Sequence, residues 1–398
     1  MARSEKERSG ELGRLVRVAI VHHWFVTRGG GERVAECIAS LFPEAEIFTL
    51  VADAPGIPQG LQERRLHTSF LQRIPLARNY HRHMMPLYPM ATEGLDLRGF
   101  DLVISSDSGP VKGVRVDAGA VHLCYCHSPM RYLYDGYETY RAQMGSVTRA
   151  AFSATAGRVR AWDERAAQRV SYFIANSEYV ADRIRRCYGR ESVVIHPPID
   201  LHRACVAQPE EHYLCAGRLV GYKRTELMME ACVRLGRKLR IAGAGPEESR
   251  LRKLAGTADV SFLGEMTTEA LWQEYAKCRA LLFAADEDFG MVPLEAQACG
   301  RPVVAYGAGG SLETVRGLDV VKDRATGIYF AEQTVASVMD GILQFEAADD
   351  AGRFDSAETQ RWAAEFATPV FLRRMREFIL QKIPEAASVM TPGIAETM

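Results

Sequence analysis

The chain has 398 residues, of which 47% are hydrophobic and 25% are charged. One hydrophobic core rarely extends over so long a chain, so we expect two domains, and this composition excludes a disordered, fibrous or collagen-like protein. The net charge of −1 conceals an asymmetry, because residues 1–200 carry 26 Lys and Arg against 22 Asp and Glu, while the remainder carries 23 against 28. A basic front half predicts contact with something anionic, such as phosphate, lipid headgroups or nucleic acid.

The sequence also indicates a cellular compartment. No stretch approaches the roughly 18 apolar residues that span a bilayer, and the segment MARSEKERSGELGR carries charges of both signs, unlike a secretory signal. The nine cysteines are scattered, without CxxC pairs or clustered histidines. We therefore expect a protein of the reducing cytosol, with no disulfide framework and no structural zinc.

The first half of the chain alternates strand and helix patterns. Residues 15–24 (LVRVAIVHHW) are apolar and β-branched, which is typical of a buried parallel strand. A glycine-rich loop, a helix that ends before Pro43 and a strand at 45–51 complete a βαβ unit. Further strands are expected at residues 101–105, 120–125 and 171–175. Alternation of this kind predicts an α/β fold with a parallel sheet and helices on both of its faces.

A second alternating series begins near Tyr213. Its strands are expected at residues 213–216, 239–242, 260–262, 280–283 and 302–305, with helices such as 224–235 and 268–278 between them. Two prolines in the stretch HPPID stiffen a connection and mark a domain boundary. We expect two Rossmann-like domains with parallel sheets that face each other across a cleft, over residues 15–197 and 198–365, and a closing segment over 366–398 whose helix returns to the first domain.

The segment EDFGMVPLE at residues 287–295 holds the most informative group of polar residues. It follows a predicted strand, and open α/β sheets bind ligands at the carboxyl ends of their strands. Pro293 suits the first position of a helix that Gly300 caps at its other end. Amide groups around residues 290–294 would then be available to an anion at the helix start.

The two glutamates of this segment have different expected tasks. The helix dipole would keep Glu295 ionised, and its carboxylate can accept two hydrogen bonds from a vicinal diol such as ribose. Glu287, on the loop before the helix, would reach the sugar ring. Either carboxylate alone is more simply explained as a solvated acid at a helix start, so the functional interpretation rests on the whole group.

Cationic residues follow the first strand of the second half. Arg218 and Lys223 lie in GRLVGYK, where a guanidinium fork and an ammonium suit a diphosphate, although each alone could be an ordinary surface cation. Gly243 and Gly245 resemble half a dinucleotide fingerprint that lacks its third glycine. A strand-to-helix turn is the simpler explanation of that pair, and also of the glycines at 307–310.

The front half offers two candidates. The glycines at 29–31 stand before a helix start, and their entropic cost indicates close backbone approach to a charged ligand, although a flexible turn would also account for them. His127 follows the strand at 120–125 in the basic half. Most lone histidines serve packing, yet this position at the end of a strand makes His127 the best front-half candidate for a site residue.

Residues 64–92 form a basic segment without a carboxylate. The segment holds five arginines and three histidines, interleaved with the apolar side chains of Phe70, Leu71, Ile74, Leu76, Met84, Met85, Leu87 and Tyr88. Such a combination favours contact with an anionic membrane surface over a solvated loop, because basic and apolar contributions add. Nucleic acid is not expected, since no recognised binding motif is present and the net charge is not basic.

Taken together, these motifs resemble the family 4 retaining glycosyltransferases of GT-B fold, over residues 16–371. The resemblance is carried by the glycine loop at 29–31, YFIANSEYV, HPPIDL, CAGRLVGYKR, RIAGAGPEESRL, FLGEMTTEAL, EDFGMVPLEAQACGRPVVAYGAGGSLETV and TGIYF. The segment CYCHSPMRYLYDGY is similar to bacterial α-mannosyltransferases that extend a polyprenol-diphosphate-linked oligosaccharide in acetan- or xanthan-type exopolysaccharide synthesis.

The resemblance implies a role for each matching residue. Arg218 and Lys223 match the cationic pair that grips the donor diphosphate. Glu287 matches the glutamate that contacts the donor sugar, Glu295 the one on the ribose hydroxyls, and His127 the histidine near the anomeric centre. The other donor-binding residues that the resemblance implies are Gly29, Gly30, Gly31, Gly243, Phe289, Gly290, Met291, Val292 and Leu294.

The implied reaction transfers mannose from GDP-mannose to a polyprenol-diphosphate-linked oligosaccharide, with retention of configuration and without a metal or cofactor. The protein would act as a cytoplasmic, peripheral protein on the inner face of the cell membrane, which it contacts through residues 64–92. Cationic side chains and helix starts would stabilise the departing phosphate, and the transition state would resemble an oxocarbenium ion. Glu287 would hydrogen-bond the sugar rather than act as a nucleophile.

Three alternatives from other classes stay open. A sugar-nucleotide epimerase of the same architecture would need no lipid acceptor and would leave residues 64–92 unexplained. An oxidoreductase built on Gly243 and Gly245 would bind NAD. A metal-dependent transferase would use the acidic run at 286–288 as a metal clamp and would lose its activity to a chelator.

Overall fold

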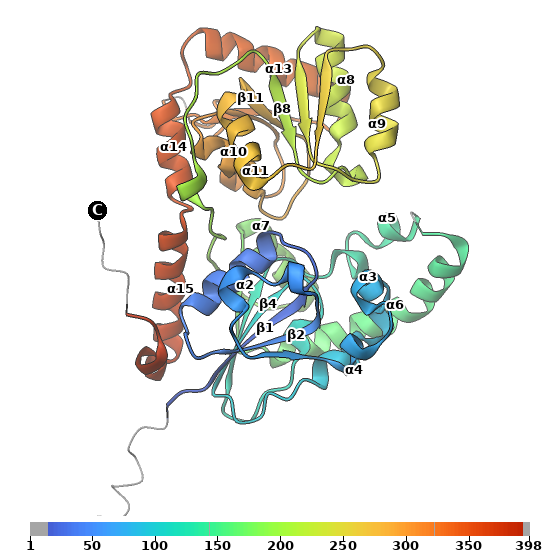
Figure 1. Cartoon of the computed structure of the whole chain (residues 1–398), viewed down its shortest axis with the longest axis vertical. Helices are drawn as coiled ribbons and strands as arrows, with labels where there is room; N and C mark the ends of the chain where they lie inside the picture. The colour runs from blue at the N-terminus through green and yellow to red at the C-terminus, as the bar shows by residue number, and fades with distance from the viewer. Residues whose placement is uncertain (1–14, 143, 322, 393–398) are drawn as a thin grey trace, which may run out of the picture. The chain divides into compact units, whose positions relative to one another are not determined.

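The structure, a computed structural model, describes residues 15–142, 144–321 and 323–392. It divides the chain into two compact units, shown in Figure 1. Unit 1 contains the chain up to Asn176, Val180–Ile195 and the chain from Leu372 onward, and unit 2 contains Ser177–Tyr179 and His196–Phe371. Each unit is built on one parallel sheet, so the expected pair of Rossmann-like α/β folds is confirmed.

Unit 1 has a seven-stranded parallel sheet, within the described residues, in the order β3-β2-β1-β4-β5-β6-β7. Its strands are β1 (Val18–Phe25), β2 (Glu46–Ala52), β3 (Leu66–Thr68), β4 (Leu102–Asp107), β5 (Val121–Cys126), β6 (Tyr172–Ala175) and β7 (Ser192–Val194). All five strands predicted in this half are present. The edge strands β3 and β7 are not predicted from the sequence. Each has only three residues, which are at best partly buried and show no apolar run.

Helices cover the sheet of unit 1, as Figure 1 shows. They are α2 (Gly30–Ser40), α3 (Ala77–Tyr80), α4 (Tyr88–Glu93), α5 (Tyr137–Ala142), α6 (Ser146–Arg169) and α7 (Glu178–Tyr188). The helix expected after the glycine loop is α2, and its apolar side chains Val34 and Ile38 are buried against the sheet. Neighbouring parallel strands need crossover connections such as these helices, so the alternation of strand and helix patterns in the sequence predicts a parallel sheet.

Unit 2 has a six-stranded parallel sheet, within the described residues, in the order β10-β9-β8-β11-β12-β13. Its strands are β8 (Tyr213–Ala216), β9 (Leu239–Ala242), β10 (Val260–Gly264), β11 (Ala280–Phe283), β12 (Val303–Tyr306) and β13 (Gly327–Phe330). The five strands predicted in this half are present, and β13 is an addition. The central strand β11 is buried along its whole length, as a doubly covered parallel strand should be.

The helices of the second half alternate with its strands and then close the chain. They are α8 (Thr225–Leu235), α9 (Glu248–Ala255), α10 (Thr268–Lys277), α11 (Met291–Ala298), α12 (Ser311–Thr314), α13 (Val335–Asp350), α14 (Ser356–Ala364) and α15 (Thr368–Lys382). Gly300 follows α11 with a φ of +76°, the left-handed conformation that makes glycine a helix terminator. None of the helices in the described ranges is long and apolar enough to cross a bilayer.

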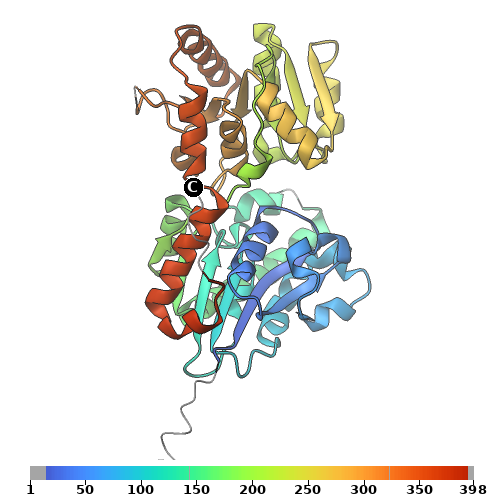
Figure 2. The ribbon, with the colours of Figure 1, turned by 60° about the vertical axis from the view of Figure 1, so that its left-hand side comes forward.

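The chain from Leu372 onward belongs to unit 1. Figure 2 shows this last part of α15 alongside the strands of unit 1. The ring of Phe378 meets that of Tyr172 at a centroid distance of 6.3 Å, and the Thr391 N–H donates to the carbonyl of Leu41 at 2.9 Å. The C-terminal segment is therefore an integral part of the first fold.

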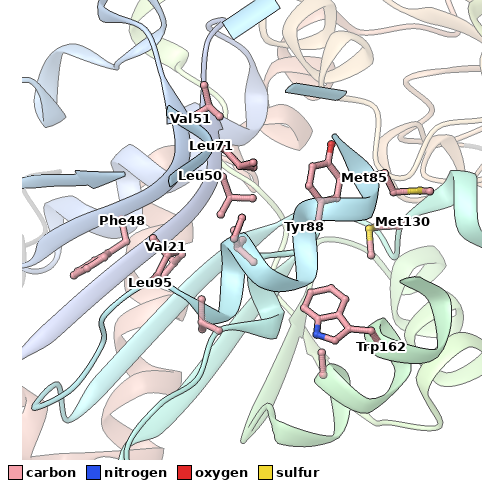
Figure 3. Packing of buried hydrophobic residues seen from close by; sticks show 14 of the residues in the cluster. Val21, Phe48, Leu50, Val51, Leu71, Met85, Tyr88, Leu95, Met130 and Trp162 are labelled. Atoms are coloured by element: carbon pink, nitrogen blue, oxygen red, sulfur yellow. The ribbon is translucent and has the colours of Figure 1, made fainter. Parts of the chain in front are cut away.

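The core of unit 1 changes the interpretation of the basic segment 64–92. Leu71, Met85 and Tyr88 are among the buried residues that pack together in Figure 3, with exposures of 1%, 5% and 2%. The prediction that these three side chains contact a membrane is wrong, because they fill the core beneath the segment. Of the apolar side chains predicted to face a membrane, the clearly exposed ones are Phe70 and Leu76.

Candidate active site

The strand order of each sheet reverses at one place. In unit 1, β1 lies between β2 and β4, and in unit 2, β8 lies between β9 and β11. Open α/β sheets bind ligands at the carboxyl ends of the strands beside such a reversal. The glycine loop at 29–31 follows β1, the loop at 217–223 follows β8, and the loop at 286–290 follows β11. The topology therefore brings the residues predicted from the sequence to the two reversal points.

Lys223 and Glu287 meet at the reversal point of unit 2. The Lys223 ammonium forms an ion pair with Oε1 of Glu287, and the two side chains are only 15% and 18% exposed. The ammonium also lies 5.7 Å from the centroid of the Phe283 ring, a cation–π contact. The fold thus joins a predicted cation and a predicted carboxylate that lie 64 positions apart in the sequence.

Arg218 lies on the same loop as Lys223 in a different environment. Its side chain is exposed, and its guanidinium has no hydrogen bond or ion pair with a residue that the structure describes. Arg218 and Lys223 both line a cavity of about 10 Å³, close to the room that one water molecule needs. A diphosphate is far larger than this cavity, so it can reach Arg218 only from the open side of the loop.

Glycines hold the loops after β8 and β9 close together. A Cβ placed on Gly243 would lie 2.0 Å from the carbonyl oxygen of Gly217, and one on Gly245 would lie 2.3 Å from that of Leu219. Both distances are shorter than any real contact. The GxG pair therefore allows two strand-end loops to touch, in agreement with its interpretation as a turn, while donor binding by Gly243 stays a prediction.

Another glycine supports the loop that carries Glu287. The Gly310 N–H donates to the carbonyl of Glu287 at 2.8 Å, and a Cβ on Gly310 would lie 2.2 Å from the Cα of Phe289. The Phe289 ring is buried and stacks on His196 at a centroid distance of 5.4 Å. Because its side chain is part of the core, Phe289 can offer a ligand only its backbone.

Helix α11 begins two residues earlier than the sequence predicts. Its N-cap is Gly290, with a φ of +87° that favours glycine, and Pro293 is the third residue of the helix rather than the first. No side chain within the described residues caps this helix start. Pro293 lacks an N–H, so an anion would meet the amides of Met291, Val292 and Leu294. The Leu294 side chain itself is buried.

Glu295 differs from the carboxylate expected from the sequence. It is the fifth residue of α11, beyond the first turn in which the helix dipole acts. Burial raises its pKa, against the smaller opposite effects of the Tyr275 hydroxyl, 2.8 Å from Oε2, and of the charge on Lys223. Burial therefore shifts this pKa in the direction opposite to the one expected from the dipole, and the ionised form of Glu295 stays a prediction.

Replacement of Glu295 by glutamine is expected to change how stability depends on pH. Because the pKa of Glu295 is raised in the folded protein, the fold binds more protons than the unfolded chain, and the free energy of unfolding falls as pH rises from about 4.5 through the folded pKa. E295Q removes this loss and still accepts a hydrogen bond from Tyr275. Urea unfolding at a series of pH values should show that the free energy of unfolding of the variant increases relative to that of the wild type as pH rises. A difference that stays constant with pH would contradict the expectation.

His127 lies at the reversal point of unit 1 in a hydrogen-bonded group. Its backbone N–H donates to the carbonyl of Asp107 at 2.7 Å, and its ring Nε2 lies 2.8 Å from the Ser106 hydroxyl. The same hydroxyl lies 3.2 Å from Nδ1 of His22. A Cβ on Gly31 would lie 3.5 Å from His22 and 3.8 Å from Nε2 of His127. The predicted glycine loop and the predicted histidine are therefore neighbours.

The backbone angles at the three glycine positions of this loop do not require glycine. None of Gly29, Gly30 and Gly31 has a positive φ, and Gly29 is extended at −152°. What glycine supplies is space, since Gly29 and Gly30 are exposed and Gly31 leaves room beside the histidines. The next residue, Glu32, is buried, and burial raises the pKa of its carboxyl.

Three polar neighbours of the predicted residues are absent from the sequence prediction. Ser106 lies near the end of the buried strand β4, His22 lies beside it within β1, and Tyr275 lies inside α10. The run of polar residues that ends β4 (SSD) and the histidine pair within β1 are the available signals for the first two, because polar side chains in a buried strand need partners. No sequence signal relates Tyr275 to Glu295.

Two Rossmann-like parallel-sheet folds with polar loops at the strand ends are the arrangement of the GT-B fold class. Residues 28–203 match the family profile described as Glycosyltransferase Family 4, and residues 205–360 match the profile described as Glycosyl transferases group 1. The chain belongs to the family 4/group 1 glycosyltransferases.

Solved structures of low sequence identity share the fold. An Anabaena HepE protein in complex with UDP and glucose has a TM-score of 0.66 at 16% identity, over 92% of this chain and 100% of that one. A sucrose-phosphate synthase from Thermosynechococcus elongatus has a TM-score of 0.67 at 17% identity, over 92% and 99% of the two chains. These similarities support the GT-B assignment.

Curated relatives match part of the chain. A protein of Corynebacterium glutamicum named GDP-mannose-dependent monoacylated alpha-(1-6)-phosphatidylinositol monomannoside mannosyltransferase is 27% identical over 44% of this chain and 55% of its own length. A D-inositol 3-phosphate glycosyltransferase of Mycobacterium tuberculosis is 30% identical over 49% of this chain and 45% of its own length. The chain spans about half the length of the curated relatives it matches.

Proposed function

We propose that the protein is a retaining glycosyltransferase that moves mannose from GDP-mannose to a polyprenol-diphosphate-linked oligosaccharide in bacterial exopolysaccharide synthesis. The observation that carries the proposal is the meeting of Lys223 and Glu287 after two neighbouring strands, beside the accessible guanidinium of Arg218. A positive potential next to a carboxylate is what a nucleotide sugar needs, since its diphosphate is anionic and its sugar offers hydroxyl donors.

The cations stabilise the leaving group in this proposal. Negative charge develops on the phosphate as the glycosidic bond breaks, and a fixed, mostly buried ammonium interacts with it more strongly than a charge in bulk water can. Arg218 binds the diphosphate as a fork, and Lys223 binds it as a point charge. The amides of Met291 and Val292 at the start of α11 add further donors.

Glu287 is assigned to the sugar and not to nucleophilic attack. Its carboxylate is held by the Lys223 ammonium, and such a charge partner lowers the reactivity of a nucleophile while it orients a hydrogen-bond acceptor. Retention then results from attack by the acceptor on the face that the diphosphate leaves, with a donor phosphate oxygen taking the proton of the acceptor hydroxyl. His127 is assigned to contact with the donor sugar, in line with the family resemblance.

The choice of mannose rests on the relatives. The Corynebacterium glutamicum protein is named for its dependence on GDP-mannose, whereas the Anabaena protein of the same fold is described with UDP and glucose. We base the choice on the Corynebacterium glutamicum relationship, which has 27% identity over 44% of this chain. It supports a guanosine nucleotide and mannose for this chain.

An anionic membrane surface is the proposed location of the acceptor. Leu76 is 65% exposed and Tyr80 is 53% exposed, both on the basic segment 64–92, where Arg73 and Arg82 are exposed as well. Leu76 has a φ of +61°, a left-handed conformation that is costly for leucine. An exposed apolar side chain on a strained backbone supports a role in binding at an interface.

Replacement of Leu76 by asparagine is expected to weaken binding to vesicles of anionic lipid about tenfold, because burial of one leucine is worth about 1.5–3 kcal/mol. Asparagine tolerates the left-handed conformation, so the fold should be unaffected. Leu254 on α9, which is 59% exposed, supplies the matched control L254N. Co-sedimentation with vesicles measures the effect, and equal binding by L76N and wild type would exclude Leu76 from the membrane contact.

A panel of radiolabelled nucleotide sugars tests the function directly. Purified protein is incubated with GDP-mannose, UDP-glucose or UDP-galactose and a polyprenol-diphosphate oligosaccharide, with and without a chelator. We expect label from GDP-mannose in the lipid phase, with or without the chelator. Label from a UDP-sugar alone would assign another donor, and conversion of the donor into its epimer without acceptor would indicate an epimerase.

A further inference from the structure

The Ser106 side chain connects two histidines of unit 1. Its hydroxyl lies 2.8 Å from Nε2 of His127 and 3.2 Å from Nδ1 of His22. His22 Nδ1 also lies 3.1 Å from the backbone carbonyl oxygen of Ser106. Ser106 and His22 are completely buried. Distances of this kind are hydrogen bonds, so each proton between the three side chains has a definite place.

The position of the proton on His22 follows from its partners. A carbonyl oxygen can only accept, so Nδ1 of His22 must carry a hydrogen that points to the Ser106 carbonyl. Burial, and then the neighbouring His23 and His127, lower the pKa of His22 well below its usual value, so the ring is neutral and its Nε2 has no hydrogen. That Nε2 is buried and has no hydrogen-bond partner within the described residues.

The Ser106 hydroxyl hydrogen therefore has one acceptor left. It cannot point to Nδ1 of His22, which already carries a hydrogen, and the remaining contact is Nε2 of His127. We infer that Ser106 is a positioning residue that fixes His127 as the tautomer with its proton on Nδ1, so that the ring offers the donor sugar a neutral N–H. This inference rests on the proposed function, in which His127 contacts that sugar.

A fixed neutral tautomer suits sugar transfer. The transition state resembles an oxocarbenium ion and is positively charged at the anomeric carbon. An imidazolium beside it would repel that charge, whereas a neutral N–H donates to a sugar hydroxyl without adding charge. The ring must also present the same nitrogen in every turnover. The Ser106 hydroxyl achieves this because its hydrogen has only one available acceptor. Gly31, next to both histidines, leaves the edge of the group accessible.

The neighbouring residue on β4 provides a matched control. Ser105 makes the same kind of hydrogen bond, 2.8 Å from Nε2 of His122, and both residues are completely buried. Successive residues of a strand point to opposite faces of the sheet, so this second pair lies on the other face. Loss of the Ser105 hydroxyl removes its bond to His122, whereas loss of the Ser106 hydroxyl removes its contacts with His127 and His22, so only Ser106 leads to His127.

Histidine ring spectra test the tautomer without any assay of activity. The protein is labelled with ¹⁵N in its ten histidines, and two-bond ¹H–¹⁵N correlations distinguish the two neutral forms, with the His127 signal assigned from H127Q. We expect the Nδ1–H form at His127 in wild type and in S106T, and a mixture of forms in S106A. The Nε2–H form at His127 in wild type would overturn the inference.

Kinetics then separate positioning from stability. S106A should lower kcat for sugar transfer by about tenfold with the KM for the donor nearly unchanged, S106T should recover most of the rate, and S105A should keep it. A wild-type rate in S106A, or an equal loss in S105A, would overturn the inference. Absence of sugar transfer by the wild type would refute the proposed function, and the ring spectra would still decide the tautomer.

Discussion

Replacement of Lys223 by alanine is expected to lower the rate of sugar transfer by about 10²- to 10³-fold, the usual cost of one preorganised group that stabilises charge in a transition state. Lys223 is mostly buried and paired with Glu287, so its charge is held where water screens it weakly. Alanine removes the contribution of the ammonium to the positive potential on the departing phosphate and leaves Glu287 without this partner. Initial rates of label transfer measure the effect, and thermal unfolding shows whether the variant is folded.

Two further variants make this test specific. Lys253 on α9 is an exposed lysine of the same unit, and K253A should keep the wild-type rate. In the K223A background, E287Q should lower the rate of sugar transfer little further, because the effects of replacing side chains that act as a unit are not additive. Near wild-type transfer by folded K223A would refute the assignment of the donor site to this part of unit 2.

The placement of Lys223 and Glu287 illustrates what the sequence predicts well. Each residue comes a few positions after a short apolar strand, β8 or β11, and the carboxyl ends of parallel strands share one edge of a sheet. The strand pattern therefore places both side chains at that edge without any knowledge of contacts. Their direct ion pair needs the strand order as well, because β8 and β11 are neighbours in space and not in the sequence.

Burial is the property that the sequence conceals. Leu71 and Leu76 belong to the same basic segment, yet the first is 1% exposed in the core and the second is 65% exposed. The composition of such a segment is the same whether its apolar side chains face a core or a membrane. Burial also changes the expectation for Glu295, since the helix start alone predicts that the dipole favours the ionised form, while burial among residues distant in the sequence raises its pKa.

Buried polar groups of unit 1 complete this contrast. Lys112, just after β4, is completely buried and forms ion pairs with Asp163 at 2.6 Å and Asp107 at 3.1 Å. Nothing near Lys112 in the sequence distinguishes it from a surface lysine. The hydroxyls of Tyr134 and Tyr188 donate to the other oxygen of Asp163 at 2.9 and 2.8 Å. Burial acts against the charge on Lys112, but the two carboxylates together raise its pKa.

Replacement of Lys112 by methionine is expected to lower the free energy of unfolding by about 3–5 kcal/mol, because it leaves buried carboxylates without their cation. Burial already raises the pKa of Asp163, and the loss of Lys112 removes the main opposing influence. The damage should extend to the candidate active site, since the carbonyl of Asp107 accepts the His127 N–H. Urea unfolding measures the stability, and the rate of sugar transfer measures the effect on the site.

A second substitution separates a charge effect from a simple loss of packing. In the wild type, Asp163→Asn should destabilise the fold, because it weakens the ion pair with Lys112. In the K112M background the same change should restore stability, because a neutral amide replaces a buried carboxylate that has lost its cation. Such a reversal of sign is possible only for groups within one network. If D163N lowers the free energy of unfolding equally in both backgrounds, Lys112 contributes by packing alone, and the charge pairing beneath His127 is not what holds this part of unit 1 together.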